Sequence, residues 1–334
     1  MANQEQQTDI YELDEKLREL KEDEAKLDET IRQVEEHLLV KGGSPRENPR
    51  FLRIKSFWLR VFYGCIYVAL IIAATLYSDT TLALLLAIFA GLDAFEFYRM
   101  ARLRSRTVSF VVGIPSAVLF PLAALLGPDA IYAVILLSLL ALLTWFILDT
   151  RTRIMDVAYT FFGASYTGLM LAALVLIRSA AHSISGGVLF GVYVEAQVLA
   201  GIFTAGIFAS VWANDSFAYL VGSLFGKHKM VPKISPKKTW EGFYAGIVGS
   251  LIIWLLMLLI PGTNLTPVIA ILSGLLCGAV GVIGDLVESR IKRSSGVKDS
   301  GSLIPGHGGM LDRTDSLLLV GITAYFILKL GGVL

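Results

Sequence analysis

The chain has 334 residues, of which 55% are hydrophobic and 17% are charged, and its mean hydropathy is +0.66. These values exclude an ordinary soluble domain and predict an integral membrane protein. The net charge of +1 argues against a general affinity for nucleic acid, and Cys65 and Cys277, both within apolar runs, argue against a disulfide framework or a cysteine metal site.

Residues 1–56 differ from the rest of the chain. Aliphatic residues recur at alternating spacings of three and four between Ile10 and Leu38, which predicts a soluble amphipathic helix of about four heptads. The stretch Gly42-Gly43-Ser44-Pro45 ends it. A solvated helix and a self-associating one that forms a homodimer both fit this pattern. Docking on a membrane surface fits less well, because the polar face is acidic.

Apolar runs of about 20 residues, long enough to cross ~30 Å of hydrocarbon as helices, follow from Phe57 onward. Open strands would leave peptide groups unpaired in lipid, so helices are expected. The fold class is therefore all-α, a polytopic membrane protein with about nine transmembrane helices after the N-terminal helix. The runs are 57–77, 80–98, 108–126, 130–148, 157–177, 196–225, 243–260, 266–288 and 316–333.

Loop charges predict the orientation in the membrane. Lysine and arginine gather in alternate loops, within 99–106, 151–153, 227–238 and 290–313, whereas the loops between them offer only Arg178. Cytoplasmic loops carry the excess of basic residues. We therefore expect a protein of the inner cell membrane with its N-terminus and its polar motifs in the cytoplasm and its C-terminus outside. Three regions are expected: 1–56, a cytoplasmic helix and linker; 57–178, a first transmembrane region; and 179–334, a second that carries the polar motifs.

One face of the eighth apolar run carries polar residues out of the membrane. Asp285 is followed by Glu288, Ser289 and Lys292 at positions i+3, i+4 and i+7. Polar residues at membrane depth are costly and therefore suggest function. The alternative is an ordinary helix end that holds an internal Glu288–Lys292 ion pair.

Asp312 and Asp315 lie one turn apart where the last apolar run begins. Acidic residues in a first helical turn are often simple caps. Here, however, glycines surround His307 nearby, and the same short segment is rich in cations: Arg290, Lys292, Arg293, Lys298 and Arg313. Carboxylates beside a basic cluster favour a Mg²⁺ ion shared with phosphate groups. His307 fits a structural imidazole in a glycine turn as well as phosphate contact or proton handling.

A second polar cluster interrupts the sixth run and the loop after it. Asp215 has no acidic or basic partner one helical turn away, which favours a functional role for it. The Ser235-Pro-Lys-Lys sequence offers a hydroxyl and two cations, Lys237 and Lys238, on a proline-stiffened turn suited to phosphate oxygens. These lysines also fit the excess of cytoplasmic charge. The stretch lacks the Walker pattern of P-loop proteins.

Asp93 and Glu96 form a weaker pair in the second run. Arg99 and Arg102 follow within one or two helical turns. An internal ion pair along this helix is the favoured interpretation.

The segment SRIKRSSGVKDSGSLIPGHGGMLDRTDS, residues 289–316, resembles the signature of the phosphatidate cytidylyltransferases, or CDP-diacylglycerol synthases. Residues 215–242 are similar to a second block shared by that family. The resemblance implies that CTP and phosphatidic acid react at the membrane to give CDP-diacylglycerol and pyrophosphate, with Mg²⁺ required and a second metal ion left open. It implies that Asp285 and Asp312 hold the metal, and Asp315, one turn later, is a further metal candidate.

Residues 179–334 would accordingly form the catalytic region. The catalytic candidates are Asp285, Lys298, Asp299, His307 and Asp312. The substrate-binding candidates are Asp215, Ser235, Lys237, Lys238, Ser289, Lys292, Arg293 and Arg313. The alternative enzyme is a CTP-dependent one that acts on another lipid phosphate or a polyprenol. A transporter fits poorly, because its polar residues should recur at mid-membrane rather than gather at one face.

Overall fold

The computed structural model describes residues 49–103, 107–181, 184–301 and 308–334. The predicted heptad helix and His307 lie outside the described residues. Internal contacts divide the chain into Met1–Ser56 and Phe57–Leu334. The architecture and contacts below concern the second unit.

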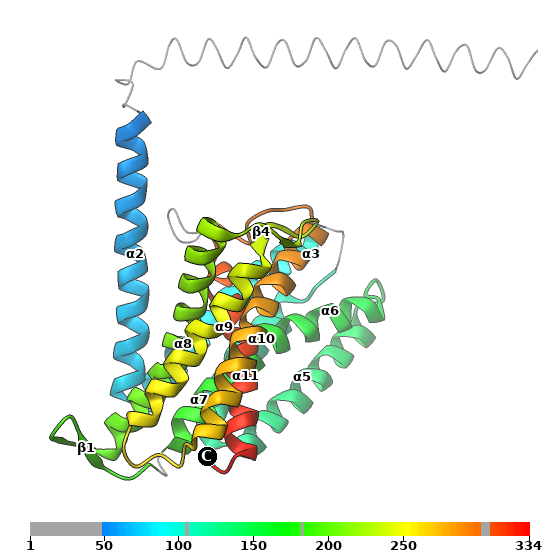
Figure 1. The fold of residues 1–334 in the computed structure, drawn as a ribbon. Coiled ribbons are helices and arrows are strands. Elements are labelled where there is room, and N and C mark those ends of the chain that lie inside the picture. The colour runs from blue at the N-terminus through cyan, green and yellow to red at the C-terminus, as the bar shows by residue number, and fades with distance from the viewer. Residues whose placement is uncertain (1–48, 104–106, 182–183, 302–307) are drawn as a thin grey trace, which may run out of the picture. The chain divides into compact units, whose positions relative to one another are not determined.

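Helices dominate the described residues, as predicted (Figure 1). They are α2 (Pro49–Tyr77), α3 (Asp79–Arg102), α4 (Phe110–Ala123), α5 (Pro128–Leu148), α6 (Ile154–Ala164), α7 (Met170–Ala180), α8 (Ala196–Phe225), α9 (Trp240–Leu256), α10 (Pro267–Ser294) and α11 (Leu311–Leu330). Short turns extend three of them: Ala124–Leu126 after α4, a π-helical turn Ser165–Leu169 between α6 and α7, and Met257–Leu259 after α9. The prediction did not include two antiparallel hairpins, β1 (Gly187–Leu189) with β2 (Val192–Val194), and β3 (Lys229–Val231) with β4 (Ser235–Thr239).

Six helices in the described residues are long and apolar enough to cross a membrane. They are α3, α5, the continuous Ile154–Ala180, α8, Trp240–Leu259 and α10. Val61–Tyr77 of α2 and Phe110–Leu126 are apolar but shorter. The ninth predicted run corresponds to α11, which carries four charged residues along its length. A polytopic helical membrane protein is confirmed, and the number of nine spans stays a prediction.

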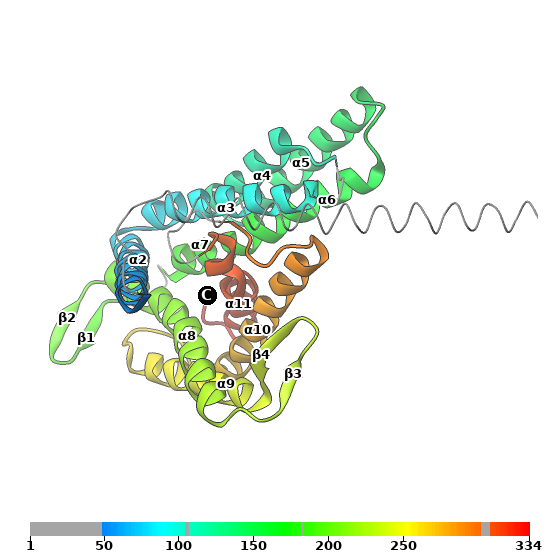
Figure 2. The ribbon, with the colours of Figure 1, turned by 90° about the horizontal axis from the view of Figure 1, so that it is seen from above.

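The helices α8, α9, α10 and α11 lie side by side, next to a layer formed by α3, α4, α5 and α6 (Figure 2). Glycine permits the close contacts within this group. A side chain at Gly242 of α9 would collide with the backbone of α8 at Ala218, and one at Gly284 of α10 would collide with the backbone of α11 at Asp315. Small residues at such crossings let transmembrane helices approach closely. The polar ends of α8, α10 and α11 are thereby brought together.

A buried arginine joins four helices at the opposite end from the polar motifs. Arg178 of α7 is fully buried, and its Nη1 lies 2.8 Å from Asp79 Oδ1 at the start of α3. Its Nε donates to the carbonyl of Thr75 on α2, and its Nη2 donates to the carbonyl of Gln197 on α8. The one cation in the loops predicted to lie outside therefore has a structural role.

Candidate active site

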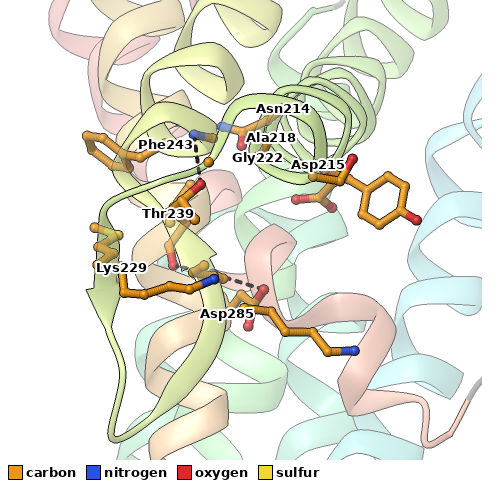
Figure 3. Close-up of a pocket in the computed structure, with 16 residues that line it drawn as sticks. Asn214, Asp215, Ala218, Gly222, Lys229, Thr239, Phe243 and Asp285 are labelled. Atoms are coloured by element: carbon orange, nitrogen blue, oxygen red, sulfur yellow. Dashed lines mark hydrogen bonds and ion pairs between the residues drawn. The ribbon is translucent and has the colours of Figure 1, made fainter.

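A cavity of about 520 Å³ lies between α8, α9, α10 and the β3–β4 hairpin (Figure 3). Four of the residues predicted to form the site line it: Asp215, Lys237, Lys238 and Asp285. Asp215 approaches it from α8 and Asp285 from α10, whereas both lysines come from β4. Residues separated by as many as 70 positions in sequence thus share one cavity.

The β3–β4 hairpin brings Lys238 to the end of α10. Its Nζ lies 2.9 Å from Asp285 Oδ2 and donates to the carbonyl of Val282 at 3.1 Å. Pairing of Lys229 with Thr239 sets the hairpin, and Thr239 then caps α9 by accepting a hydrogen bond from the amide of Gly242. The hairpin and the cap together fix the direction in which Lys238 points.

Carboxylates from three helices lie in this region. Asp285 of α10 and Asp215 of α8 line the cavity, and the backbone of Asp315 on α11 packs against Gly284, directly before Asp285. Among the described residues, no three histidine, cysteine, aspartate or glutamate side chains gather closely enough to hold a metal ion. Mg²⁺ usually takes only one or two protein carboxylates and completes its shell with phosphate oxygens and water. The hard oxygen donors present here suit an ion held jointly with a phosphate substrate.

Comparison with known proteins decides the family. The model of the cytidylyltransferase family matches residues 58–331. The chain belongs to this family. A phosphatidate cytidylyltransferase of Bacillus subtilis is 31% identical over 277 residues, which cover 81% of this chain and 97% of that protein. One of Staphylococcus haemolyticus is 33% identical over 267 residues, 78% of this chain and 95% of that protein. A chloroplastic one of Arabidopsis thaliana is 49% identical over 126 residues, 38% of this chain and 31% of its own.

The resemblance to this family, inferred from the two sequence blocks, is thereby confirmed, and the match extends well beyond them, from residue 58 to residue 331. The family match does not include the 57 residues before position 58. None of these comparisons assigns a role to an individual residue, so the site residues stay predictions.

Asp312 has other partners than Asp285. Its Oδ1 accepts from Lys292 Nζ at 2.6 Å, and its Oδ2 accepts from the amides of Gly309 and Ser300 at 2.8 and 3.3 Å. Lys292 also pairs with the buried Glu288 at 2.6 Å, so the internal ion pair given as the alternative interpretation is present. Asp312 is not among the described residues that line the cavity, so its part in a metal site stays a prediction.

The remaining described candidates lie outside the cavity lining. Ser289 Oγ donates to Asp285 Oδ1 at 3.2 Å, which supports the carboxylate that Lys238 contacts. Arg293 and Arg313 are exposed, and Arg293 donates to the carbonyl of Val297. Lys298 and Asp299 are exposed in the loop after α10, and Ser235 lies at the start of β4. None of these is among the described residues that line the cavity.

The prediction for Asp93 and Glu96 was wrong. Instead of pairing with arginines on their own helix, both carboxylates are buried and bind the last helix and the loop before it. Arg99 instead donates to the carbonyl of Ser300, and Arg102 lies over the ring of Phe110. The reason is that the free amides at the start of α11 need acceptors, and α3 passes directly beside them.

Thr239 and Asn214 line the cavity but were not predicted to belong to the site. Thr239 lines the cavity and caps α9, and a threonine three positions before Gly242 at the start of an apolar run was a readable capping signal. Asn214, directly before Asp215 in the sixth run, was not assigned a function. It is buried and donates to the carbonyl of Gly278 at 2.6 Å, so it ties α8 to α10 next to Asp215. No sequence pattern near Asn214 predicts this contact, because its partner lies 64 positions away in the chain.

Proposed function

We propose that this protein transfers the cytidylyl group of CTP to phosphatidic acid, giving CDP-diacylglycerol and pyrophosphate. The printed names of the relatives, one of them matched over 97% of its length, support this reaction. The observation that carries it is the cavity in which Lys238 contacts Asp285 of α10 and which Asp215 of α8 also lines. Such a place suits a reaction between a water-borne and a membrane-bound phosphate.

The chemistry requires that two anions be held together. An oxygen of the phosphatidate phosphate forms a bond to the α-phosphorus of CTP, and the bond from that phosphorus to the oxygen of the leaving pyrophosphate breaks. Because the attacking oxygen is already ionised at neutral pH, no side-chain nucleophile is needed. The protein contributes positioning and charge compensation, which dominate catalysis of phosphoryl and nucleotidyl transfer. Lys237 and Lys238 are the cations that reach the cavity from β4.

We propose that one or two of the predicted carboxylates Asp285, Asp312 and Asp315 hold Mg²⁺ together with phosphate oxygens of the substrate, with Asp215 nearby. Asp285 is supported by its place in the cavity lining, Asp315 by the packing of its backbone against Gly284, and Asp312 by its place one turn before Asp315. When bound, the ion would neutralise phosphate charge at the reacting centre. Lys238 holds the Asp285 carboxylate before substrate arrives, which keeps an otherwise uncompensated charge from repelling the triphosphate.

The surroundings of the cavity favour headgroup depth in the bilayer. The exposed Tyr219 lines the cavity, and the exposed Trp240 and Tyr244 directly follow lining residues in sequence. Tryptophan and tyrosine are enriched where a membrane meets water. Phosphatidic acid stays in the bilayer because each buried CH₂ contributes about 0.8 kcal/mol. We therefore place the site at the cytoplasmic face of the inner membrane, with the N-terminus inside and the C-terminus outside.

The test is a reaction of purified protein with CTP labelled in its α-phosphate, Mg²⁺ and single lipid acceptors in mixed micelles. Phosphatidic acid, a polyprenyl phosphate and an unphosphorylated polyprenol are supplied separately. We expect labelled CDP-diacylglycerol and stoichiometric pyrophosphate with phosphatidic acid alone. Release of CDP with a phosphorylated polyprenol would identify a kinase, and a CDP-polyprenol product would identify a different cytidylyl acceptor. Either result would overturn the proposal.

A further inference from the structure

The last helix is held at its start by a carboxylate from a helix far upstream. We use the term loop base for Ser300 and the stretch Gly309–Leu311, the described residues that flank the segment 302–307. Glu96 of α3 is 4% exposed and lies against this loop base. Its Oε1 accepts from the amide of Met310 at 3.0 Å, and its Oε2 accepts from the amide of Leu311 at 3.0 Å and from Ser300 Oγ at 2.7 Å.

These contacts supply hydrogen-bond acceptors for the first amides of α11, which its own N-cap residue does not provide. Met310 at the N-cap position offers no side-chain hydrogen bond to the helix, although the first amides of a helix require acceptors. Glu96 supplies them from a position 214 residues upstream. Its negative charge also suits the positive end of the helix dipole. The start of α11 is therefore fixed by α3.

Ser300 is bound on all three of its polar groups. Its hydroxyl donates to Glu96, its amide donates to Asp312 at 3.3 Å, and its carbonyl accepts from Arg99 at 3.4 Å. Glu96 can approach because glycine stands at both neighbouring positions: a side chain at Gly301 or Gly309 would collide with its carboxylate. Both flanks of the segment are thus joined through one buried acidic group.

We propose that Glu96 is a positioning residue for the cytidylyl transfer, an inference that rests on the proposed function. It is not among the described residues that line the cavity, so it does not meet substrate there. It fixes the loop base, and with it the start of α11, whose first two turns carry Asp312 and Asp315. Lys298 and Asp299, directly before Ser300, are fixed at the same time. Displacement of reacting groups by about 1 Å can lower a rate about 10²-fold.

The decisive variant is Glu96→Gln, which keeps the shape of the side chain but replaces one acceptor oxygen by an amide donor facing another donor. We expect kcat to fall about 10²-fold, while KM for CTP and for phosphatidic acid changes less than about threefold. Hydrogen exchange of the Met310 and Leu311 amides, measured by mass spectrometry in detergent, should become faster by at least about tenfold.

The matched control is Ser138→Ala, which removes a buried hydrogen bond of 2.9 Å between α5 and Ser116 of α4, away from the loop base. It should lower thermal stability without changing kcat or the exchange of the loop-base amides. Wild-type kcat in Glu96→Gln, or unchanged exchange at Met310 and Leu311, would overturn the proposal. So would a loss of kcat that Ser138→Ala reproduces at equal loss of stability.

Two further measurements keep the test decisive. If Glu96→Gln does not fold, Ser300→Ala removes only one of the three contacts of Glu96, and we expect a loss of kcat of about tenfold. Wild-type kcat in that variant would count against the proposal. If the wild-type protein forms no CDP-lipid, the proposed function fails, whereas the exchange experiment still decides whether Glu96 holds the loop base.

Discussion

Replacing Lys238 by methionine tests the charge arrangement of the cavity most directly. Its Nζ lies 2.9 Å from Asp285 Oδ2, and the two side chains are 20% and 36% exposed. At an effective dielectric constant of about 20, the attraction at that separation is roughly 6 kcal/mol. Partial exposure and the cost of desolvation reduce the net contribution, so we expect Lys238→Met to lower the free energy of unfolding by about 1–3 kcal/mol.

The expected loss of activity is larger than the loss of stability implies. A preorganised cation aimed at phosphate charge that develops during reaction contributes about 10²–10³-fold to turnover. Pyrophosphate release from CTP and phosphatidic acid in mixed micelles measures this, and thermal unfolding in the same detergent measures stability. Lys227→Met, which removes a lysine from the same loop but outside the described cavity lining, is the control and should keep near-normal turnover.

A double variant separates the two roles of Lys238. Lys238→Met combined with Asp285→Asn leaves no uncompensated charge, so we expect most of the lost stability to return, with a coupling of about 1–2 kcal/mol. Turnover should stay low, because the cation that meets the phosphates is still missing. Full turnover in Lys238→Met, or recovery of turnover together with stability in the double variant, would refute this reasoning and leave Lys238 a structural partner of Asp285.

Three other outcomes are expected. Asp312→Asn should abolish Mg²⁺-dependent pyrophosphate release, by about 10²-fold or more, in a protein that still folds; near-normal turnover would remove Asp312 from the metal site. Arg178→Met should lower stability by about 3–5 kcal/mol, because Asp79 is left without its buried partner, and adding Asp79→Asn should recover part of that loss in thermal unfolding. Deleting residues 1–44 should leave turnover unchanged and alter only the oligomeric state measured by light scattering; a folded but inactive truncation would contradict this.

The helices could be predicted from the sequence because backbone groups in lipid must form their hydrogen bonds within the protein. A peptide group without an internal partner is costly in hydrocarbon, so a long apolar run implies a helix wherever it stands. Contacts within one helix follow from spacing alone, as the Glu288–Lys292 pair and the Ser289–Asp285 hydrogen bond do. The family could be read from two motif blocks for a different reason: the chemistry of a site restricts which residues stand at which spacing.

The partners of polar groups across helices were decided only by the tertiary structure. Glu96 was assigned to its neighbouring arginines, yet it caps a helix that begins 215 residues later, and Asp312 faces Lys292 rather than Asp285. Spacing along one helix sets which residues share a face, but not which helix packs against that face. That choice depends on how closely backbones approach at small residues such as Gly242 and Gly284, and on which free amides at a helix start find an acceptor. The sequence by itself determined the apolar helices and the family of this protein. The packing of those helices determined which charged groups contact one another.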